Sequence, residues 1–191
     1  MRKPLWSWGI NLMENTMDSA LPLRKLDRAS VARKSPQNHG GAIFLRKAAA
    51  QDSQRLWAWR NHPEVRKNFF NDQIVPWEEH QGWYDKKLRA SSTKIYVAAF
   101  KHNDVGVIRF DIDENKARVS VTVDPKYFGQ GFGVKIIQLG TEAFWEEDGF
   151  KRPIIAEIKT ENSVSQKAFS RAGYRLREEV DGKVIYEKCA A

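Results

Sequence analysis

The spacing of apolar residues changes along the chain, and between residues 94 and 123 it has a period of two. Three strand candidates lie in this range: KIYVAAF (94–100), DVGVIRFDI (104–112) and ARVSVTV (117–123). In the third, Val119, Val121 and Val123 alternate with polar residues. A period of two is typical of a strand with one buried face. The turns between them, at 102–103 and 113–116, are too short for a helical crossover. The pattern therefore predicts an antiparallel meander of three strands.

The rest of the chain alternates between helical and strand patterns. In chain order we expect a strand at 42–48, helices at 51–60 and 76–88, the three strands above, a helix from Phe132 to Asp148, a strand at 153–158, a helix from Ser163 to Ala172, and two strands joined at Asp181–Gly182. His62–Pro63 ends the first helix, because the residue before a proline disfavours helical geometry. The segment 153–158 is almost wholly apolar, which is typical of a parallel strand in mid-sheet. The fold class is therefore α+β with a mixed sheet.

Composition and charge divide the 191 residues into two parts. Residues 1–40 lack any sustained period, so we expect a flexible basic leader followed by one domain at 41–191. Of the net charge of +8, residues 1–50 carry +6, from 9 Lys/Arg and 3 Asp/Glu. The domain is thus almost balanced, which weakens a nucleic-acid role for it. No apolar run is long enough to span a membrane, the N-terminus is a poor signal peptide, and the single cysteine, Cys189, lies near the end, so we expect a cytoplasmic protein.

Three glycines precede the helix that starts at Phe132: Gly129, Gly131 and Gly133. Glycine suits a backbone that needs positive φ or that approaches a phosphate closely, and a helix N-terminus adds unpaired N–H donors. Lys135 in the first turn adds positive charge. The segment is neither a Walker loop nor a dinucleotide fingerprint, since it lacks Gly-Lys-Ser/Thr and follows an alternating strand. It predicts a diphosphate site, and the alternative is a tight turn that admits close helix packing.

A second segment, EIKTENSVSQKAFSRAGY (157–174), has its own spacing of polar and aromatic residues. Asn162 can cap the short helix, and Ser165 and Phe169 then lie on one helical face. Read on its own, this segment is equally an N-cap with a core phenylalanine.

Together, the two segments resemble the GNAT acyl-CoA N-acyltransferases. The family's coenzyme motif is Gln/Arg-x-x-Gly-x-Gly/Ala, and Gly131-x-Gly133 matches its second half, with Phe128 in the Gln/Arg position. The resemblance implies acetyl-CoA, a mostly antiparallel sheet with helices on both faces, a splayed strand pair that holds pantetheine, and a possible homodimer. It assigns coenzyme contacts to Val121, Val123, Gly129, Gln130, Gly131, Phe132, Gly133, Val134, Lys135, Asn162, Ser165 and Phe169.

The chemistry requires a polarised thioester carbonyl, a base for the amine and a proton for the thiolate. A main-chain N–H near Val121 can polarise the carbonyl. Many relatives use a tyrosine as acid where this chain has Phe169, so we expect Ser165 in that role, with Tyr174 and Tyr127 behind it. Glu157 is the candidate base. No metal is implied, because the histidines lack ligand spacing.

For the acceptor, three stretches at 56–71, 74–88 and 105–112 resemble the N-acetyltransferases of pseudaminic acid biosynthesis, which act on the 4-amino group of a UDP-linked sugar. This resemblance, carried mostly by Arg60–Asn61 and Glu79–His80, assigns acceptor contacts to Arg60, Asn61, Phe70, Trp77, His80 and Trp83. Arg60 and His80 would bind the diphosphate, and the aromatic residues would line the sugar or base pocket. Three alternatives stay open: core roles for these side chains, a protein N-terminal acetyltransferase, and a non-catalytic module that binds CoA or nucleic acid.

Overall fold

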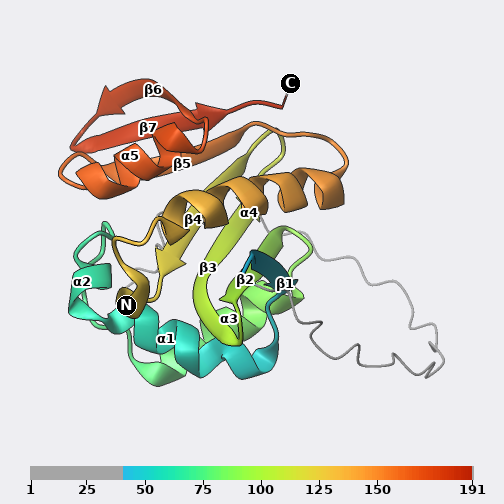
Figure 1. Cartoon of the computed structure of the whole chain (residues 1–191), viewed down its shortest axis with the longest axis vertical. Helices are drawn as coiled ribbons and strands as arrows, with labels where there is room; N and C mark the ends of the chain where they lie inside the picture. The colour runs from blue at the N-terminus through green and yellow to red at the C-terminus, as the bar shows by residue number, and fades with distance from the viewer. Residues whose placement is uncertain (1–40, 191) are drawn as a thin grey trace, which may run out of the picture.

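The computed structural model describes residues 41–190, and the predicted leader at 1–40 lies outside them (Figure 1). Its centre is one seven-stranded sheet, in which only β4 and β5 run parallel. In spatial order the strands are β1 (Ile43–Lys47), β2 (Thr93–Phe100), β3 (Asn103–Ile112), β4 (Ala117–Val123), β5 (Ile154–Lys159), β7 (Lys183–Lys188) and β6 (Arg175–Val180). The predicted meander is β2, β3 and β4, and the mixed α+β class is confirmed.

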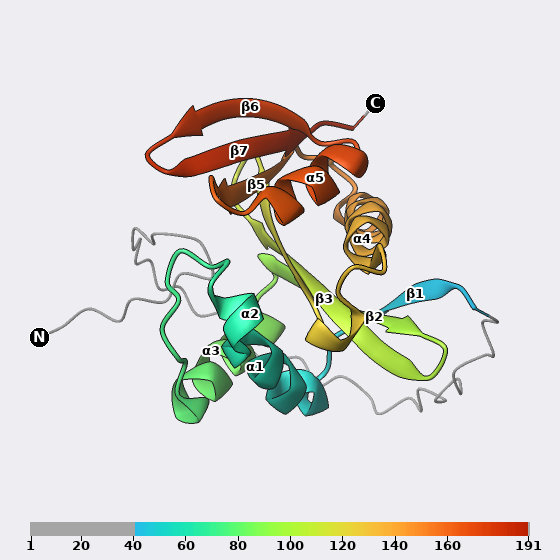
Figure 2. The same ribbon diagram turned by 60° about the vertical axis from the view of Figure 1, so that its left-hand side comes forward.

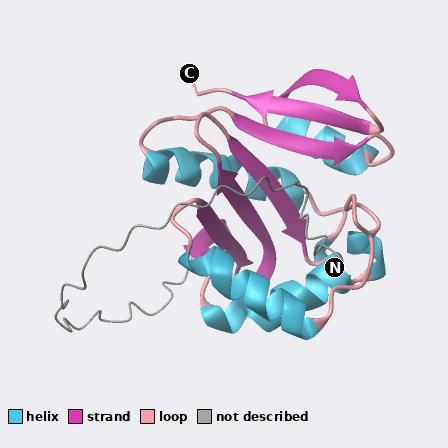
Figure 3. Ribbon diagram, turned by 180° about the vertical axis from the view of Figure 1, so that it is seen from behind, coloured by secondary structure: helices cyan, strands magenta, loops and turns pink. Residues whose placement is uncertain are grey.

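Helices cover both faces of the sheet, as Figures 2 and 3 show from two sides. The first face carries α1 (Ser53–Asn61), α2 (Pro63–Arg66) and α3 (Trp77–Arg89), preceded by the short η1 (Ala50–Asp52). The second carries α4 (Phe132–Asp148), which follows η2 (Pro125–Tyr127), and α5 (Ser163–Arg171). Each face has its own apolar core: a larger one under α4 and α5 and a smaller one under α1 and α3.

The first predicted helix stops where expected, but a new turn of helix begins at once. His62 has an extended ψ of 130° and is the N-cap of α2, with its Nδ1 accepting a hydrogen bond from the Glu64 N–H. Pro63 occupies the first helical position, where its missing N–H costs nothing. The proline therefore both ends α1 and starts α2.

Two glycines outside the expected glycine segment determine how closely α4 packs on the sheet. A Cβ at Gly106 in β3 would lie 2.6 Å from the Thr122 main-chain oxygen and 2.8 Å from Cδ1 of Ile136. A Cβ at Gly140 in α4 would lie 2.6 Å from Cδ1 of Ile108. The sequence pattern allows close helix packing as the alternative role of the glycines at 129–133. In the structure, Gly106 and Gly140 have that role.

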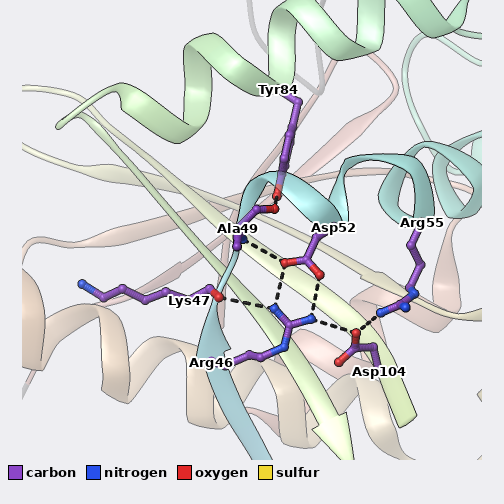
Figure 4. A network of polar contacts seen from close by, with 7 residues as sticks. All are labelled: Arg46, Lys47, Ala49, Asp52, Arg55, Tyr84 and Asp104. Atoms are coloured by element: carbon purple, nitrogen blue, oxygen red, sulfur yellow. Dashed lines mark hydrogen bonds and ion pairs between the residues drawn. The ribbon is translucent and has the colours of Figure 1, made fainter. Parts of the chain in front are cut away.

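A network of ion pairs fixes the α1–α3 layer to the sheet edge (Figure 4). Arg46 of β1 donates to both oxygens of Asp52 at 2.7 Å and to Asp104 at 2.8 Å, and Arg55 also contacts Asp104. Burial alone would raise the pKa of Asp52, but hydrogen bonds from Arg46 and from the Ala49 N–H outweigh it and lower the pKa. Asp52 therefore stays ionised and holds the start of α1 in place.

Candidate functional site

The two parallel strands separate soon after they begin. β4 and β5 pair only at Ala117 with Ile154 and at Arg118 with Ile155, and beyond this junction the sheet opens. A cleft of about 640 Å³ lies there, lined by residues of β3, β4, β5, α2, α4 and α5 and of the loops between them. The splayed strand pair expected from the resemblance is therefore present.

The main chain of β4 supplies unpaired hydrogen-bonding groups to this cleft. The Ala117 N–H donates to Pro153 at 2.9 Å, on the β5 side, while the Asp124 N–H donates to Val105 at 2.9 Å, on the β3 side. Because N–H and C=O groups alternate sides along a strand, those of Val121 and Val123 point toward β5, where no strand pairs with them. Both residues line the cleft.

The N-terminus of α4 forms the mouth of the cleft. Gly131 is the N-cap with φ +80°, Gly129 has φ +75°, and a Cβ at either position would meet nothing within 4 Å. The first N–H groups of a helix have no intrahelical partner, so Phe132, Gly133 and Val134 present donors to a bare concave backbone. Such a cradle fits a diphosphate.

The predicted residues of the glycine segment do not all lie in this cradle. Gly129, Gly131, Phe132, Gly133 and Val134 line the cleft. Gln130 instead donates from Nε2 to the Lys126 carbonyl at 3.3 Å, and Lys135 is exposed outside the cleft wall. These two residues therefore act at most at the rim.

Helix α5 forms the opposite wall, and Asn162 caps it as expected. The Asn162 Oδ1 accepts a hydrogen bond from the Ser165 N–H at 3.1 Å, and Asn162, Ser165 and Phe169 all line the cleft. Tyr127 lines it too, with its ring 5.5 Å from that of Phe132.

Tyr174 is a correction to the predicted catalytic set. Its side chain is 2% exposed, its hydroxyl is hydrogen-bonded to Thr141 at 2.7 Å, and its ring packs edge-on against Phe169. Burial raises the pKa of this phenol. Tyr174 lies behind Phe169 and outside the cleft wall, so it cannot donate a proton there.

The comparison with known proteins agrees with this geometry. A family model described as an acetyltransferase (GNAT) domain matches residues 42–175. The chain belongs to the GNAT acetyltransferase family. It is therefore an N-acetyltransferase, and its acyl donor is acetyl-CoA. The alternative of a non-catalytic module is set aside.

Solved structures share the GNAT fold at low sequence identity. A domain from Methanocaldococcus jannaschii has a TM-score of 0.69 and 21% identity, over 78% of this chain and 99% of that one. The aminoglycoside acetyltransferase AAC(6')-Ib, in complex with coenzyme A and kanamycin, has a TM-score of 0.66 and 16% identity. The match covers 76% of this chain and 93% of that one. Spermidine N-acetyltransferase from Vibrio cholerae, in complex with CoA and spermine, has a TM-score of 0.66 and 13% identity. The match covers 76% of this chain and 92% of that one. No curated protein sequence matches the chain.

Most of the predicted acceptor residues lie outside this GNAT cleft. Arg60 is 2% exposed, donates from Nη2 to the Asn71 carbonyl at 2.5 Å and lies over the Phe69 ring. His80 is 1% exposed, and its Nε2 is 3.0 Å from the Ser53 carbonyl oxygen. Burial lowers the pKa of His80 to about 4, so the ring is neutral at pH 7. The expected diphosphate contacts of Arg60 and His80 are therefore wrong, because both residues are almost completely buried and neither lines the cleft.

The other four predicted acceptor residues divide between packing and the cleft. Asn61 exchanges two hydrogen bonds with the Val75 main chain, at 2.8 and 2.9 Å. Trp77 and Trp83 are half-buried and both pack against His80, with ring centroids 6.0 and 5.7 Å from its ring. Only Phe70, which is 41% exposed, lines the cleft. The two tryptophans thus serve in packing, Trp83 against the smaller core and Trp77 against Trp57 and His80. Asn61 anchors the loop before α3.

The acceptor side of the cleft is instead lined by charged residues that the sequence reasoning missed, apart from Glu157. They face the α1–α3 side: Glu64, Lys67, Arg109, Asp111, Arg118 and Glu157. Arg109 lies opposite Ser120, and Asp111 opposite Arg118, in the β3–β4 register. The signal was available in the alternation of RFDI and ARVS, where charged side chains occupy one face of two central strands.

Two searches of residues 41–190 give negative findings. No cluster of three or more His, Cys, Asp or Glu side chains in this part is arranged to hold a metal ion. No helix in the same range combines the length and the apolar character needed to cross a membrane.

Proposed function

We propose that the protein acetylates a primary amine on an acceptor that also carries negative charge, and that the acceptor is a UDP-linked amino-deoxy sugar, modified at its 4-amino group. The observation that supports this proposal is the charge on the acceptor side of the cleft, which we call the acceptor wall: Glu64, Lys67, Arg109, Asp111, Arg118 and Glu157. Each of its three acids already has a cation: Glu64 has Lys67 at 2.5 Å, Asp111 has Arg109 and Lys87 at 2.8 Å, and Glu157 has Lys183 at 2.9 Å.

The same charge disfavours polycationic acceptors. Burial alone would raise the pKa of Asp111, but Arg109 and Lys87 outweigh it and lower the pKa, so this carboxylate is ionised and already neutralised. A spermidine or aminoglycoside acceptor would meet Arg109 and Arg118 without an unpaired acid to compensate them. A basic peptide N-terminus meets the same difficulty.

The coenzyme is assigned to the other side of the cleft. Its diphosphate fits the cradle of Gly129 and Gly131, and its pantetheine arm fits along the exposed main-chain groups of Val121 and Val123. Acetyl-CoA supplies an acetyl group already activated as a thioester. The Val121 N–H, aimed at the gap, donates a hydrogen bond to the carbonyl oxygen as negative charge develops on it.

Two side chains complete the proposed chemistry. Ser165 lies on the α5 wall one turn before Phe169, and we assign it to protonate the departing sulfur. Glu157 lies on β5 with its side chain 21% exposed, and we assign it to accept the proton of the attacking amine. Lys183 donates a hydrogen bond to this carboxylate at 2.9 Å, which fixes its orientation.

A thiol-release assay with acetyl-CoA tests the proposed function. The acceptors are a UDP-linked 4-amino sugar, the same sugar without UDP, spermidine, kanamycin and a short peptide with a free N-terminus. We expect the UDP-linked sugar to give the highest kcat/KM. Faster turnover of spermidine, kanamycin or the peptide would show that the acceptor class is wrong.

A further inference from the structure

Arg118 holds an unusual position among the charged residues of the cleft. It lies in β4 at the junction with β5, opposite Asp111 in the register with β3, and its side chain is 28% exposed. Its Nε is buried without a hydrogen-bond partner, and its one ion pair is to Glu157 at 4.0 Å, beyond hydrogen-bonding distance. Within residues 41–190, Arg118 donates no hydrogen bond.

The neighbouring cations differ, because each already holds a carboxylate. Arg109 donates from Nε to Asp111 at 2.8 Å and lies over the Trp83 ring, while Lys183 holds Glu157. Lys67 is bonded to Glu64. A guanidinium presents five N–H donors in a fixed plane, and those of Arg118 are the ones left for a ligand on this wall.

We propose that Arg118 binds an oxyanion of the acceptor, which is a phosphate oxygen if the acceptor is the UDP-linked sugar proposed above. The inference rests on that proposed function for the identity of the anion. It adds the residue that would distinguish an anionic acceptor from a neutral or cationic one. It also replaces the role that the sequence assigned to Arg60 and His80.

The position of Arg118 along β4 separates it from the diphosphate of the coenzyme. Val123, next to the glycine cradle, is five positions along β4 from Arg118, which at about 3.3 Å per residue is roughly 17 Å. Val121, at the reacting carbonyl, is three residues from Arg118, or about 10 Å along the strand. The arginine side chain extends from the strand and shortens the distance that the acceptor must span. One sugar ring can then connect an amine beside Val121 to a phosphate beside the Arg118 guanidinium.

A purely structural role for Arg118 makes a different prediction. An ion pair at 4.0 Å on a partly exposed side chain contributes little to stability. If Arg118 only braced the strand junction, its loss would change neither acceptor affinity nor acceptor choice. Kinetics with matched acceptors therefore separate the two roles.

The test compares Arg118→Gln with wild-type enzyme, using the 4-amino sugar with and without its UDP group. Loss of a charge-assisted hydrogen bond should raise the KM for the UDP-linked sugar about 10- to 100-fold. The KM for acetyl-CoA and for the UDP-free sugar should not change. Arg177→Gln is the matched control, because Arg177 lies on β6, is 57% exposed and is paired with Glu187, away from the cleft.

A binding measurement gives a second readout that does not need turnover. UDP is titrated into CoA-saturated protein, so that the α4 cradle is already filled, and heat is measured by calorimetry. We expect wild type and Arg177→Gln to bind UDP and Arg118→Gln to lose most of this binding. Unchanged UDP affinity in Arg118→Gln overturns the inference.

The outcomes distinguish the inference from the proposed function. If wild type acetylates the UDP-linked sugar and Arg118→Gln has the same KM, the inference is wrong and the function stands. If wild type does not acetylate that sugar, but UDP still binds the CoA complex through Arg118, the anion site is supported and the proposed acceptor is wrong.

Discussion

Gly131 offers the most direct test of the coenzyme site, because a nearly identical glycine lies at the other end of the same helix. Gly131 caps the N-terminus of α4 with φ +80° and ψ 0°, and Gly149 caps its C-terminus with φ +73° and ψ −16°. A Cβ at either position would meet nothing within 4 Å. Gly131→Ala and Gly149→Ala therefore impose the same backbone strain, but only the first adds a methyl group to the proposed diphosphate cradle.

The expected magnitudes follow from this geometry. Placing alanine in the left-handed region costs about 1–2 kcal/mol of folding free energy. For a chain of this size each kcal/mol lowers Tm by about 2–4 °C. Both variants should show this loss. In Gly131→Ala the methyl group also keeps the phosphate from the helix N–H donors, and losing one such bond to a charged group weakens CoA binding about 10- to 100-fold.

Two measurements check this pair: the thermal unfolding midpoint, and the Kd of CoA by calorimetry. We expect equal shifts in Tm and a weaker Kd in Gly131→Ala alone. If both variants weaken CoA binding equally, the effect is a consequence of lost stability. If neither weakens it, the diphosphate does not bind at the α4 N-terminus, and the placement of the coenzyme is refuted.

Three further predictions concern the acid, the packing of α4 and the response to pH. Ser165→Ala should lower kcat about 100-fold with little change in the KM for acetyl-CoA, measured by thiol release, because a general acid contributes at least this much; an unchanged kcat would remove Ser165 from that role. Gly106→Ala should destabilise the fold by about 1–3 kcal/mol in urea unfolding, since its Cβ would lie 2.6 Å from the Thr122 main-chain oxygen. Gly82→Ala in α3 is the control and should not destabilise the fold, because its Cβ would meet no atom within 4 Å. Burial alone would raise the pKa of Glu147, but hydrogen bonds from Lys94, Tyr96 and Lys47 outweigh it and lower the pKa to about 2, so its contribution to stability is complete above pH 4.5 and is lost as the pH falls toward 2. Glu147→Gln should flatten the fall of Tm across this range, and an unchanged fall would show that other groups cause it.

The sequence predicted the elements well where local patterns decide the structure. The period of two between residues 94 and 123 gave the meander, and α4 has the bounds expected from its apolar stripe, Phe132 to Asp148. Asn162 caps α5 because an N-cap depends on the neighbouring residues alone. The coenzyme side of the cleft is built from such local features, which is why most of its residues were found.

The acceptor side was predicted poorly because it depends on contacts between distant segments. Arg60 is buried by Phe69 and the Asn71 carbonyl, and His80 by the Ser53 carbonyl 27 residues earlier. Nothing in the composition around Arg60 or His80 distinguishes a buried polar group with a main-chain partner from an exposed one that binds phosphate. The packing role of Gly106 likewise appears only once α4 lies against β3.

The geometry of β4 separates recognition of the two substrates. Its main-chain groups at Val121 and Val123 point within the sheet toward β5, while the side chains of Arg118, Ser120 and Thr122 lie on the face under α1–α3. Main-chain donors do not change when a side chain is replaced, so the proposed contacts with acetyl-CoA are insensitive to substitutions on that face. Substitutions on that face of β4 can therefore change the acceptor specificity without weakening the binding of acetyl-CoA. An arginine at 118, lining the acceptor side of the cleft, fits an acceptor that brings its own negative charge.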